Sequence, residues 1–498
     1  MILSELVQIL PGVCRIVGDD SIDIVGMHHD SREILPGDLF VARPGGNVDG
    51  ARYARDAVGR GARAVLAPCV SEALLEGVGV PRVLVDDLAK AFGVAASRLY
   101  GDPSRALSVV GITGTNGKTT VAHLVASAVD AALGSVGCGL MGTVGHRFRE
   151  LSWTAEHTTP EADELARVLS SMQRAGASHV AMEVSSHALA LERVAGIQFQ
   201  VACFTNLSLD HLEFHGSMEA YGEAKAQLFT RCAPAKAVIH VGDPFGARLA
   251  ARATGPVVTV AGTPGAHADL VAHTVAFGPH GLEAKVRTAQ QEIVLRSRLV
   301  GQHNLENLLV ALGVVEALGL DLQAAARGLA AAGGAPGRLE RCDGPKDDVV
   351  VFVDYAHTPD ALARVLDAVR SAARGQVVCV FGCGGDRDKT KRAPMGQAVA
   401  SRADRAIVTS DNPRSEDPAR IAEAVVEGMS RLHHSKVIVE LDRRQAIEQA
   451  ILGANIGDTI VVAGKGHEAL QIAGDVRRAF DDRAETRRAL ALRRAGNV

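Results

Sequence analysis

Cysteine is scarce in this chain, whose eight cysteines are scattered over 498 residues without a CxxC pair or a zinc-finger spacing. This scarcity excludes a disulfide-built scaffold, and we expect mostly buried thiols in a protein of the reducing cytoplasm. Long apolar runs are also absent, since Glu316 interrupts the best candidate, residues 308–320, short of the roughly 18 residues of a membrane helix. The opening Met-Ile-Leu-Ser-Glu lacks the basic lead of a secretory signal. We therefore expect a soluble, cytoplasmic protein.

Neither sign of charge predominates. Lys and Arg total 53 against 57 Asp and Glu, a formal net charge of −4. This balance argues against a general nucleic-acid binder, although it does not exclude a local basic cleft. Hydrophobic residues make up 47% of the chain, which suffices for a sizeable core. At roughly 100–200 residues per domain, the length indicates about three domains.

Clusters of glycine and proline mark the limits of the three domains that we predict. The first, residues 1–106, ends near Gly101-Asp-Pro-Ser, and the second, residues 107–335, ends at Gly333-Gly-Ala-Pro-Gly. The third covers residues 336–498. Apolar strands alternate with helical patterns throughout, which predicts an α/β fold with mostly parallel sheets. The predicted strands are 38–42, 64–67, 82–86, 107–112, 179–184, 200–204, 237–241, 349–354, 377–381, 406–409 and 459–463, and the predicted helices include 51–60, 88–99 and 119–133.

A Gly/Thr-rich loop, Gly111-Ile-Thr-Gly-Thr-Asn-Gly-Lys-Thr-Thr120, joins a predicted strand to a predicted helix. Glycines let backbone N–H groups approach phosphate, the helix N-terminus adds a favourable potential, and Lys118 can reach a terminal phosphate. The Thr119 hydroxyl is the group that such loops place on Mg²⁺. Ile112 stands where strict P-loop spacing has its first glycine. Because Lys-Thr-Thr serves a triphosphate better than a dinucleotide, we predict ATP binding.

The segment Thr113-Gly-Thr-Asn-Gly-Lys-Thr-Thr120 resembles the ATP loop of the Mur ligases, which build the peptide of bacterial cell-wall precursors. Folylpolyglutamate synthetases share this loop, so the loop alone does not separate the two families. The resemblance implies a P-loop ATPase-like second domain, a Rossmann-like third domain and a smaller α/β first domain. It also implies an ATP site made by Gly114, Thr115, Asn116, Gly117, Lys118, Thr119, Thr120, Asn304, Asp354 and His357, although His303 replaces the usual aromatic beside Asn304.

Polar residues follow two predicted strands of the second domain. Glu183 and His211 lie at such strand ends, where they are either ordinary satisfied polar groups or ligands of a cation that accompanies ATP. On bare sequence, Lys225 is a solvated helix lysine. The segment Tyr221-Gly-Glu-Ala-Lys225, however, resembles the Mur segment whose lysine is carbamylated by CO₂. The resemblance therefore implies a Mg²⁺ site of Thr119, Glu183, His211 and carbamylated Lys225, with catalytic roles for Lys118, Lys225, His211 and Arg338.

Two further segments resemble those that hold the sugar-nucleotide peptide in this family. Asp30-Ser-Arg32, followed by residues 36–42, resembles the uridine-nucleotide segment of the MurE and MurF types, although such a triplet is more often a turn or a helix cap. His157-Thr-Thr-Pro160 is the second, and Leu191 stands where the family often has glutamine. The resemblance implies that the substrate is bound by Ser31, Thr158, Thr159, Ser185 and Arg193.

Three segments of the third domain follow predicted strands, and we expect them to converge at one edge of its sheet. They are Gly384-Gly-Asp-Arg-Asp-Lys389, Asp411-Asn-Pro-Arg414 and Gly464-Lys-Gly-His-Glu468. Asp-Asn-Pro-Arg resembles the motif of MurE-type ligases that add meso-diaminopimelate. A guanidinium can hold the additional carboxylate that lysine lacks. The resemblance implies a diaminopimelate site of Arg387, Asp411, Asn412, Pro413, Arg414, Gly464 and Glu468.

The resemblance extends from Asp30 to the tail. It implies a monomeric, ATP- and Mg²⁺-dependent ligase of MurE type that adds meso-diaminopimelate to UDP-N-acetylmuramoyl-L-alanyl-D-glutamate through an acyl phosphate in peptidoglycan synthesis, and hence in cell shape and division. Two alternatives stay open at this stage. A folate polyglutamylating enzyme shares the loop but has no need of a uridine segment, and an ATP-binding regulatory module would carry out no chemistry.

Overall fold

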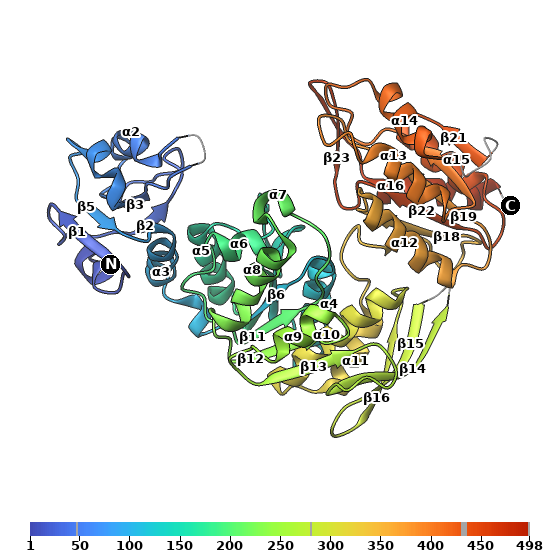
Figure 1. Cartoon of the computed structure of the whole chain (residues 1–498), viewed down its shortest axis with the longest axis horizontal. Helices are drawn as coiled ribbons and strands as arrows, with labels where there is room; N and C mark the ends of the chain where they lie inside the picture. Colours follow the sequence, from blue (N-terminus) through green and yellow to red (C-terminus); the bar gives the residue numbers. More distant parts are fainter. Residues whose placement is uncertain (46–47, 279–280, 430–435, 497–498) are drawn as a thin grey trace. The chain divides into compact units, whose positions relative to one another are not determined.

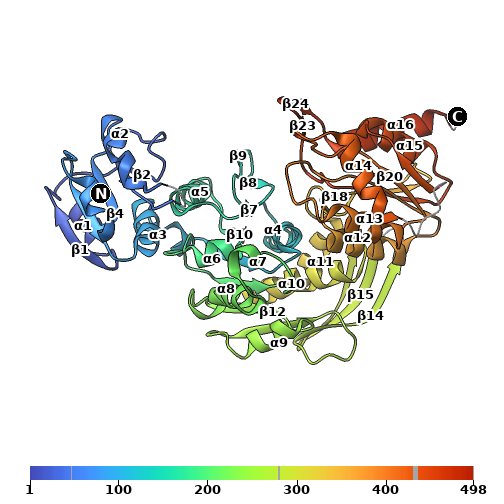
Figure 2. The same cartoon turned by 45° about the horizontal axis from the view of Figure 1, so that its top comes forward.

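The computed structural model describes residues 1–45, 48–278, 281–429 and 436–496. It forms two compact units, one of residues 1–260 with 310–325 and the other of residues 261–309 with 326–498 (Figures 1 and 2). Each of the three predicted stretches contains a main sheet of its own. Among the described residues, no helix combines the length and apolar character that a membrane span requires. The domain limits at residues 106 and 335 stay a prediction.

The first sheet lies within residues 13–85 and has the strand order β1-β5-β4-β3-β2. Strands β2 to β5 are parallel, and β1 pairs with β5 in the antiparallel sense. The predicted strands and the second predicted helix are confirmed, whereas the predicted helix 51–60 is a 3₁₀ turn followed by α2. The elements are α1 (Leu3–Val7), β1 (Val13–Val17), β2 (Gly26–His28), β3 (Asp38–Val41), η1 (Gly50–Tyr53), α2 (Ala54–Gly59), β4 (Ala64–Pro68), η2 (Cys69–Leu75), β5 (Arg82–Val85), α3 (Leu88–Leu99) and η3 (Pro103–Arg105).

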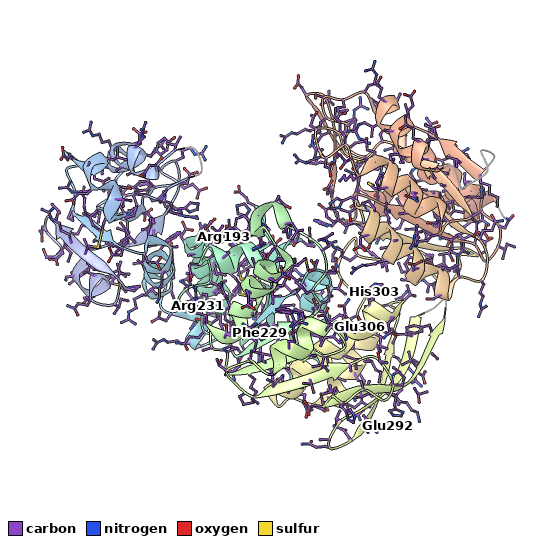
Figure 3. The ribbon with its side chains drawn as sticks, in the orientation of Figure 1. Arg193, Phe229, Arg231, Glu292, His303 and Glu306 are labelled. Carbon is purple, nitrogen blue, oxygen red and sulfur yellow. A yellow bond between two sulfur atoms is a disulfide. The ribbon has the colours of Figure 1, made fainter. Side chains whose placement is uncertain are left out.

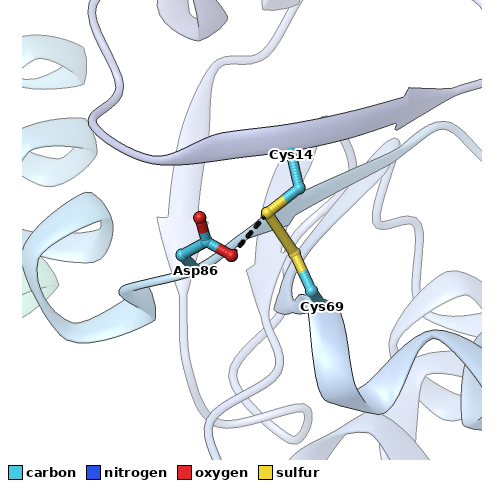
Figure 4. Close-up of side chains that lie close together, drawn as sticks. All are labelled: Cys14, Cys69 and Asp86. Atoms are coloured by element: carbon cyan, nitrogen blue, oxygen red, sulfur yellow. Dashed lines mark hydrogen bonds between the residues drawn. A yellow bond between two sulfur atoms is a disulfide. The ribbon is translucent and has the colours of Figure 1, made fainter.

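Two cysteines of this sheet depart from the expected thiols. Cys14 on β1 and Cys69 at the start of η2 form a disulfide, and Asp86 Oδ1 lies 2.8 Å from the Cys14 sulfur (Figure 4). These are side chains of metal-binding type. Because the two sulfurs are bonded to each other, neither is a thiolate that could ligate a metal. The other cysteines are free and buried or partly buried, as expected: Cys138, Cys203, Cys232, Cys342, Cys379 and Cys383.

The second sheet has eleven strands in the order β16-β15-β14-β13-β12-β11-β6-β10-β7-β8-β9. Its parallel centre confirms the predicted α/β class, and β6 lies between β10 and β11. The antiparallel strands at both ends were not predicted. The strands are β6 (Ser108–Thr113), β7 (Cys138–Gly142), β8 (Gly145–Phe148), β9 (Leu151–Trp153), β10 (His179–Glu183), β11 (Val201–Phe204), β12 (Lys236–His240), β13 (Val257–Ala261), β14 (Leu270–Gly278), β15 (Gly281–Arg287) and β16 (Glu292–Ser297).

Several helices of this stretch follow its parallel strands, whereas α5 follows β9 and α10 and α11 follow β16. Of these, α4 begins directly after the Gly/Thr loop and confirms the predicted helix 119–133. Its apolar side chains are almost all buried, which fits a helix packed on a sheet. The helices are α4 (Lys118–Leu133), α5 (Ala162–Arg174), α6 (Ser186–Ala190), α7 (Leu212–His215), α8 (Met218–Thr230), α9 (Pro244–Ala250), α10 (Gln302–Leu318) and α11 (Leu322–Ala331).

The third sheet has the order β17-β18-β22-β19-β20-β21, and all pairs except β17–β18 are parallel. Its side chains alternate between two cores: Val377, Cys379 and Phe381 lie in one, and Val378 and Val380 in the other. Helices therefore cover both faces, as a Rossmann-like sheet requires. The elements are β17 (Glu340–Arg341), β18 (Val350–Asp354), α12 (Pro359–Ala372), β19 (Val377–Phe381), α13 (Arg392–Ala400), β20 (Arg405–Val408), α14 (Pro418–Val426), η4 (Glu427–Met429), β21 (Val437–Val439), α15 (Arg443–Leu452), β22 (Thr459–Ala463), β23 (Leu470–Ala473), β24 (Val476–Ala479) and α16 (Asp482–Gly496).

Candidate functional site

The Gly/Thr loop leaves the carboxyl end of β6 and leads into the first turn of α4. Gly117 caps the helix with φ 85°, a left-handed conformation that glycine adopts without strain. Lys118 is the first helical residue, and its Nζ donates to the carbonyls of Gly114 (2.8 Å) and Thr115 (2.9 Å). The loop thus presents backbone N–H groups and an ammonium at a helix N-terminus, which is the arrangement that binds phosphate.

A second segment, residues 205–208, supports this loop from beyond β11. Thr205 Oγ1 donates to the Asn116 carbonyl at 2.6 Å, and the Thr115 N–H donates to the Asn206 carbonyl at 2.8 Å. A Cβ atom on Gly114 would lie 1.9 Å from Thr205 Oγ1, so the close approach requires glycine. Sequence reasoning did not assign this supporting role to Thr205 and Asn206. The only sequence signal for this role was their position directly after a strand.

Glu183 lies at the end of β10, beside the start of α4. Thr119 Oγ1 donates to its Oε2 at 2.9 Å, and the Thr143 N–H donates to its Oε1 at 2.8 Å. The carboxylate is buried. A buried carboxylate and hydroxyl at the phosphate loop are hard oxygen donors of the kind that Mg²⁺ prefers. Thr119 and Glu183 are therefore brought together as predicted, and Thr143 is an addition that the sequence did not indicate.

Lys225 is fully buried on α8, contrary to the solvated lysine that bare sequence suggested. Its Nζ donates to the Gly114 carbonyl at 2.9 Å and lies 4.3 Å from the centre of the Tyr221 ring. Burial lowers the pKa of the Lys225 ammonium well below its ordinary value, and the Lys118 ammonium lowers it further. The environment thus favours the neutral amine, which is the form that reacts with CO₂.

His211 lies in a cluster of rings beyond the phosphate loop, where it caps the short α7 with φ 52°. Its ring is 4.8 Å from that of His187 and 6.0 Å from that of Tyr221. Burial, followed by the neighbouring His211 and His215 rings, lowers the pKa of His187. Within the described residues, no hydrogen bond or ion pair joins His211 to Glu183 or Lys225. Sequence reasoning gave no role to His187 or His215.

Three of the predicted substrate residues lie together around the end of β10. Thr159 Oγ1 donates to the Glu183 carbonyl at 2.9 Å and accepts from the Ser185 N–H at 3.0 Å. Arg193, labelled in Figure 3, donates to the Thr159 carbonyl at 3.1 Å and forms an ion pair of 2.8 Å with Glu161. Arg193, which the resemblance assigns to substrate binding, is thus paired in this structure with the carboxylate of Glu161.

The other two substrate residues lie at different places. Thr158 Oγ1 is 3.0 Å from Thr143 Oγ1, next to the carboxylate of Glu183. Ser31 lies in a turn after β2 of the first sheet, where Arg32 Nε bonds Asp30 Oδ1 at 2.9 Å. The Asp-Ser-Arg triplet therefore forms a turn stabilised by its own ion pair, and substrate binding by Ser31 stays a prediction.

The three segments of the third sheet converge as predicted. Arg414 Nη1 donates to the Gly385 carbonyl at 2.7 Å, and Asn412 Nδ2 donates to Glu468 Oε2 at 3.0 Å. Arg414 has φ 52°, and the hairpin β23–β24 holds its backbone through a hydrogen bond from the Gly474 N–H at 2.6 Å (Figure 2). The hairpin was not predicted. Arg387 is exposed at the same edge.

The Asp411 carboxylate faces the Gly464 backbone, since a Cβ on Gly464 would lie 3.1 Å from Asp411 Oδ2. Pro413 comes closer still to Gly385, where a Cβ atom would lie 1.9 Å from the Pro413 carbonyl oxygen. These contacts explain glycine at both positions. A cavity of about 460 Å³ lies instead at the amino ends of β18 and β22 and is lined by none of the predicted site residues.

Arg338, Asp354 and His357 meet around Tyr355 at the end of β18. The Arg338 guanidinium lies 4.6 Å from the Tyr355 ring centre, and His357 Nδ1 is 2.9 Å from the Tyr355 carbonyl. Burial raises the pKa of the Asp354 carboxyl, against the lowering effect of Arg338. The Asp354 carboxylate accepts the Leu339 N–H at 2.6 Å.

Asn304 lies in the first turn of α10. It is buried, and its Nδ2 donates to the Val300 carbonyl at 2.9 Å while its Oδ1 accepts from Asn307 at 3.1 Å. Its neighbour His303 is exposed (Figure 3). The Asn304 amide is thus bonded to Asn307 of its own helix and to Val300 just before that helix.

Comparison with known proteins places this geometry in a family. Residues 23–100 match the model described as Mur ligase family, catalytic domain, residues 112–315 match the Mur ligase middle domain, and residues 337–466 match the Mur ligase glutamate ligase domain. The UDP-N-acetylmuramoyl-L-alanyl-D-glutamate–2,6-diaminopimelate ligase of Gloeobacter violaceus is 46% identical over 477 residues, covering 95% of each chain. The protein of the same name from Streptomyces coelicolor is 46% identical over 476 residues, covering 95% of this chain and 93% of its own.

Comparison with solved structures gives the same result as comparison with sequences. A structure of a ligase with the same printed name has a TM-score of 0.73 and 33% identity, and the match covers 99% of both chains. The folylpolyglutamate synthase of Mycobacterium tuberculosis shares the fold alone, with a TM-score of 0.60, 21% identity and coverage of 76% of this chain and 93% of its own. Since relatives of nearly equal length share almost half of its residues, this chain belongs to the Mur ligase family.

Proposed function

We propose that this protein joins meso-diaminopimelate to UDP-N-acetylmuramoyl-L-alanyl-D-glutamate in peptidoglycan synthesis, with hydrolysis of ATP to ADP and phosphate. We infer the specificity from one observation: Asp411–Arg414, Gly464–Glu468 and Arg387 lie at one edge of the third sheet. This edge offers guanidinium groups for carboxylates and carboxylates for ammonium, which suits a dicarboxylic diamino acid. The names of the relatives support the same substrates.

The reaction begins with activation of a carboxylate, because oxide is a poor leaving group. A carboxylate oxygen of the D-glutamyl residue attacks the γ-phosphorus of ATP, and the bond from that phosphorus to the β-γ bridging oxygen breaks to release ADP. The loop from Gly114 to Thr120 holds the phosphates, and the Lys118 ammonium offsets charge on them. We extend the family roles of Asn304, Asp354 and His357 in ATP binding, and of Arg338 in stabilising the transferred group, to this chain.

The second step forms the amide. The neutral amine of diaminopimelate attacks the acyl carbon, the bond from that carbon to the phosphate oxygen breaks, and the nitrogen gives up a proton. Positioning of the two substrates carries most of the rate, since no protein group needs to bond covalently to either. We assign Ser31, Thr158, Thr159, Ser185 and Arg193 to the sugar-nucleotide peptide.

Thr119, Glu183, His211 and a carbamylated Lys225 are the residues that would hold Mg²⁺, which neutralises phosphate charge when bound. The buried Thr119–Glu183 pair supports such a site. Carbamylation joins the neutral Lys225 amine to the carbon of CO₂ and releases one proton, which leaves a carboxylate-like anion. Burial of Lys225 against the Gly114 carbonyl supports it by favouring the neutral amine. We further propose a cytoplasmic monomer with domain limits near residues 106 and 335.

The test is phosphate release by the purified protein with ATP and UDP-N-acetylmuramoyl-L-alanyl-D-glutamate. Release that requires added meso-diaminopimelate supports the ligase. Release with a folate and glutamate instead would support the polyglutamylating alternative, and ATP binding without any release would support a regulatory module. The Mur match over residues 23–100, the part that includes the Asp-Ser-Arg turn, favours the first outcome.

A further inference from the structure

Lys465 follows β22 and is completely buried, with 0% of its side chain exposed. It lies between two glycines with positive φ, Gly464 at 118° and Gly466 at 54°. None of the contacts that the family resemblance assigns to substrate involves this lysine. Since an unpaired buried ammonium is very costly, its surroundings must satisfy it. The groups that bond its ammonium therefore indicate what Lys465 does.

The ammonium of Lys465 uses all three of its N–H groups within the candidate amino-acid site. It donates to the Leu470 carbonyl at 2.6 Å, to Asn412 Oδ1 at 3.2 Å and to Glu468 Oε2 at 3.3 Å. An ammonium has three donors and no acceptor, so the set is complete and no donor is left for a ligand. Lys465 therefore joins the loop after β20 to the loop after β22.

This arrangement fixes the orientation of the Asn412 amide. Because lysine can only donate, the Asn412 oxygen must face it, and the same oxygen accepts the Ile472 N–H at 3.0 Å. The Asn412 NH₂ then points to Glu468 Oε2 at 3.0 Å. Two donors, from Lys465 and Asn412, thus hold one oxygen of the Glu468 carboxylate.

The other oxygen of that carboxylate is available. Glu468 Oε1 accepts no hydrogen bond from any described residue, and the Glu468 side chain is 35% exposed. Asp411 lies beside it, with its Oδ1 3.8 Å from the Lys465 Nζ and buried without a hydrogen-bond partner among the described residues. Two carboxylates with unused oxygens thus lie next to the buried lysine.

The formal charge of this cluster favours a cation. Arg443 and Asp482 form a fully buried ion pair behind it, with Arg443 Nη2 2.7 Å from Asp482 Oδ2. Lys465 and Arg443 supply two positive charges, whereas Asp411, Glu468 and Asp482 supply three negative ones. The balance over these five side chains is −1, which suits one ammonium group, while the guanidiniums of Arg387 and Arg414 at the same edge suit carboxylates.

We propose that Lys465 is a positioning residue for the amino-acid substrate. It does not touch the substrate, but it holds Asn412 and Glu468 so that the free Glu468 oxygen and the excess negative charge meet the substrate's ammonium. This inference rests on the proposed function, since it concerns how that reaction recognises its amino acid.

The test compares KM for meso-diaminopimelate, ATP and the sugar-nucleotide dipeptide in the wild type and in Lys465→Met. Loss of a charge-assisted hydrogen-bond network predicts that KM for meso-diaminopimelate rises about tenfold to a hundredfold. The KM values of the other two substrates and kcat should change by less than about threefold, because the phosphate loop does not involve this lysine. Lys346→Met is the matched control, since Lys346 is exposed before β18, at the other end of the same sheet.

Lys465→Ala separates positioning from mere structural support. Methylammonium added to this variant should fill the space of the lost ammonium and lower KM for meso-diaminopimelate again. The inference alone would be overturned if KM for meso-diaminopimelate is unchanged in Lys465→Met. It would also be overturned if activity with all three substrates falls equally and methylammonium does not reverse the fall. A wild type without phosphate release dependent on meso-diaminopimelate would overturn the proposed function, and this inference with it.

Discussion

Lys118 is the side chain whose removal most directly separates phosphate chemistry from folding. Its ammonium donates to carbonyls of its own loop and its side chain is only partly buried, so Lys118→Ala should retain the fold. Loss of one charged donor to the reacting phosphate predicts a fall in kcat of about a hundredfold to a thousandfold. ADP formation and thermal unfolding measure the two effects. A variant that unfolds, or that keeps most of its turnover, would show that the lysine has another role.

Lys225 gives a second test at the scale of one residue. Lys225→Ala should be nearly inactive, and formate or acetate should restore part of the activity by replacing the carbamate oxygens. The assay measures phosphate release with and without these anions. Lys90→Ala, which removes an exposed lysine of α3, is the control and should behave as the wild type. Full activity of Lys225→Ala in CO₂-free buffer would contradict the proposed carbamate.

The lowered pKa of Lys225 also predicts a pH dependence. Since burial and Lys118 lower this pKa, more of the amine is neutral at a given pH than for an exposed lysine. The carbamate signal of Lys225 in ¹³C NMR with labelled bicarbonate should therefore persist to lower pH than that of an exposed lysine. If the wild type shows no carbamate signal that disappears in Lys225→Ala, the prediction is contradicted.

At the scale of elements, burial decided which strands the sequence could predict. Strands such as β19 and β22 are buried along their whole length, so their continuous apolar runs predicted them at the observed bounds. Strand β15 alternates between buried Leu282, Ala284 and Val286 and exposed neighbours, a pattern that an alternation search would have detected. Strand β24 is exposed throughout, and no apolar signal marks it.

The candidate site, too, could be predicted only in part from the sequence. The sequence predicted that three loops meet, because carboxyl ends of parallel strands share one edge. It could not show that Lys465 is buried or that Thr205 supports the phosphate loop, since burial and long-range hydrogen bonds depend on packing between segments distant in the chain. Lys225 likewise needed the structure before its environment could support more than a solvated cation.

The ion pair of Arg443 and Asp482 allows a test of how helices α15 and α16 are held. Each residue begins its helix, and both side chains are 0% exposed. Asp482→Ala should lower the free energy of unfolding by about 3–5 kcal/mol, because it leaves a buried guanidinium without its partner. Urea denaturation measures this loss. The double variant Arg443→Met/Asp482→Leu should lose less stability than Asp482→Ala does. A loss as large as the summed losses of the single variants Arg443→Met and Asp482→Leu would contradict the argument.

At the scale of the whole molecule, three sheets along one chain supply different parts of the proposed reaction. The phosphate loop belongs to the unit of residues 1–260 with 310–325, and the candidate amino-acid edge belongs to the other unit. A fold of this kind is shared by Mur ligases and folylpolyglutamate synthases, so fold alone does not decide the substrate. We propose that the Asp411–Arg414 segment is the feature that does, because its guanidinium can bind a carboxylate that lysine lacks.

The most direct measurement is therefore kcat/KM for meso-diaminopimelate and for lysine, with the wild type and with Arg414→Ala. A charge-assisted hydrogen bond of about 1.5–3 kcal/mol corresponds to roughly one to two decades in relative efficiency. We predict that the wild type prefers meso-diaminopimelate by at least this margin, and that Arg414→Ala loses activity with it far more than any activity with lysine. A wild type that prefers lysine, or equal losses for both amino acids, would contradict the account.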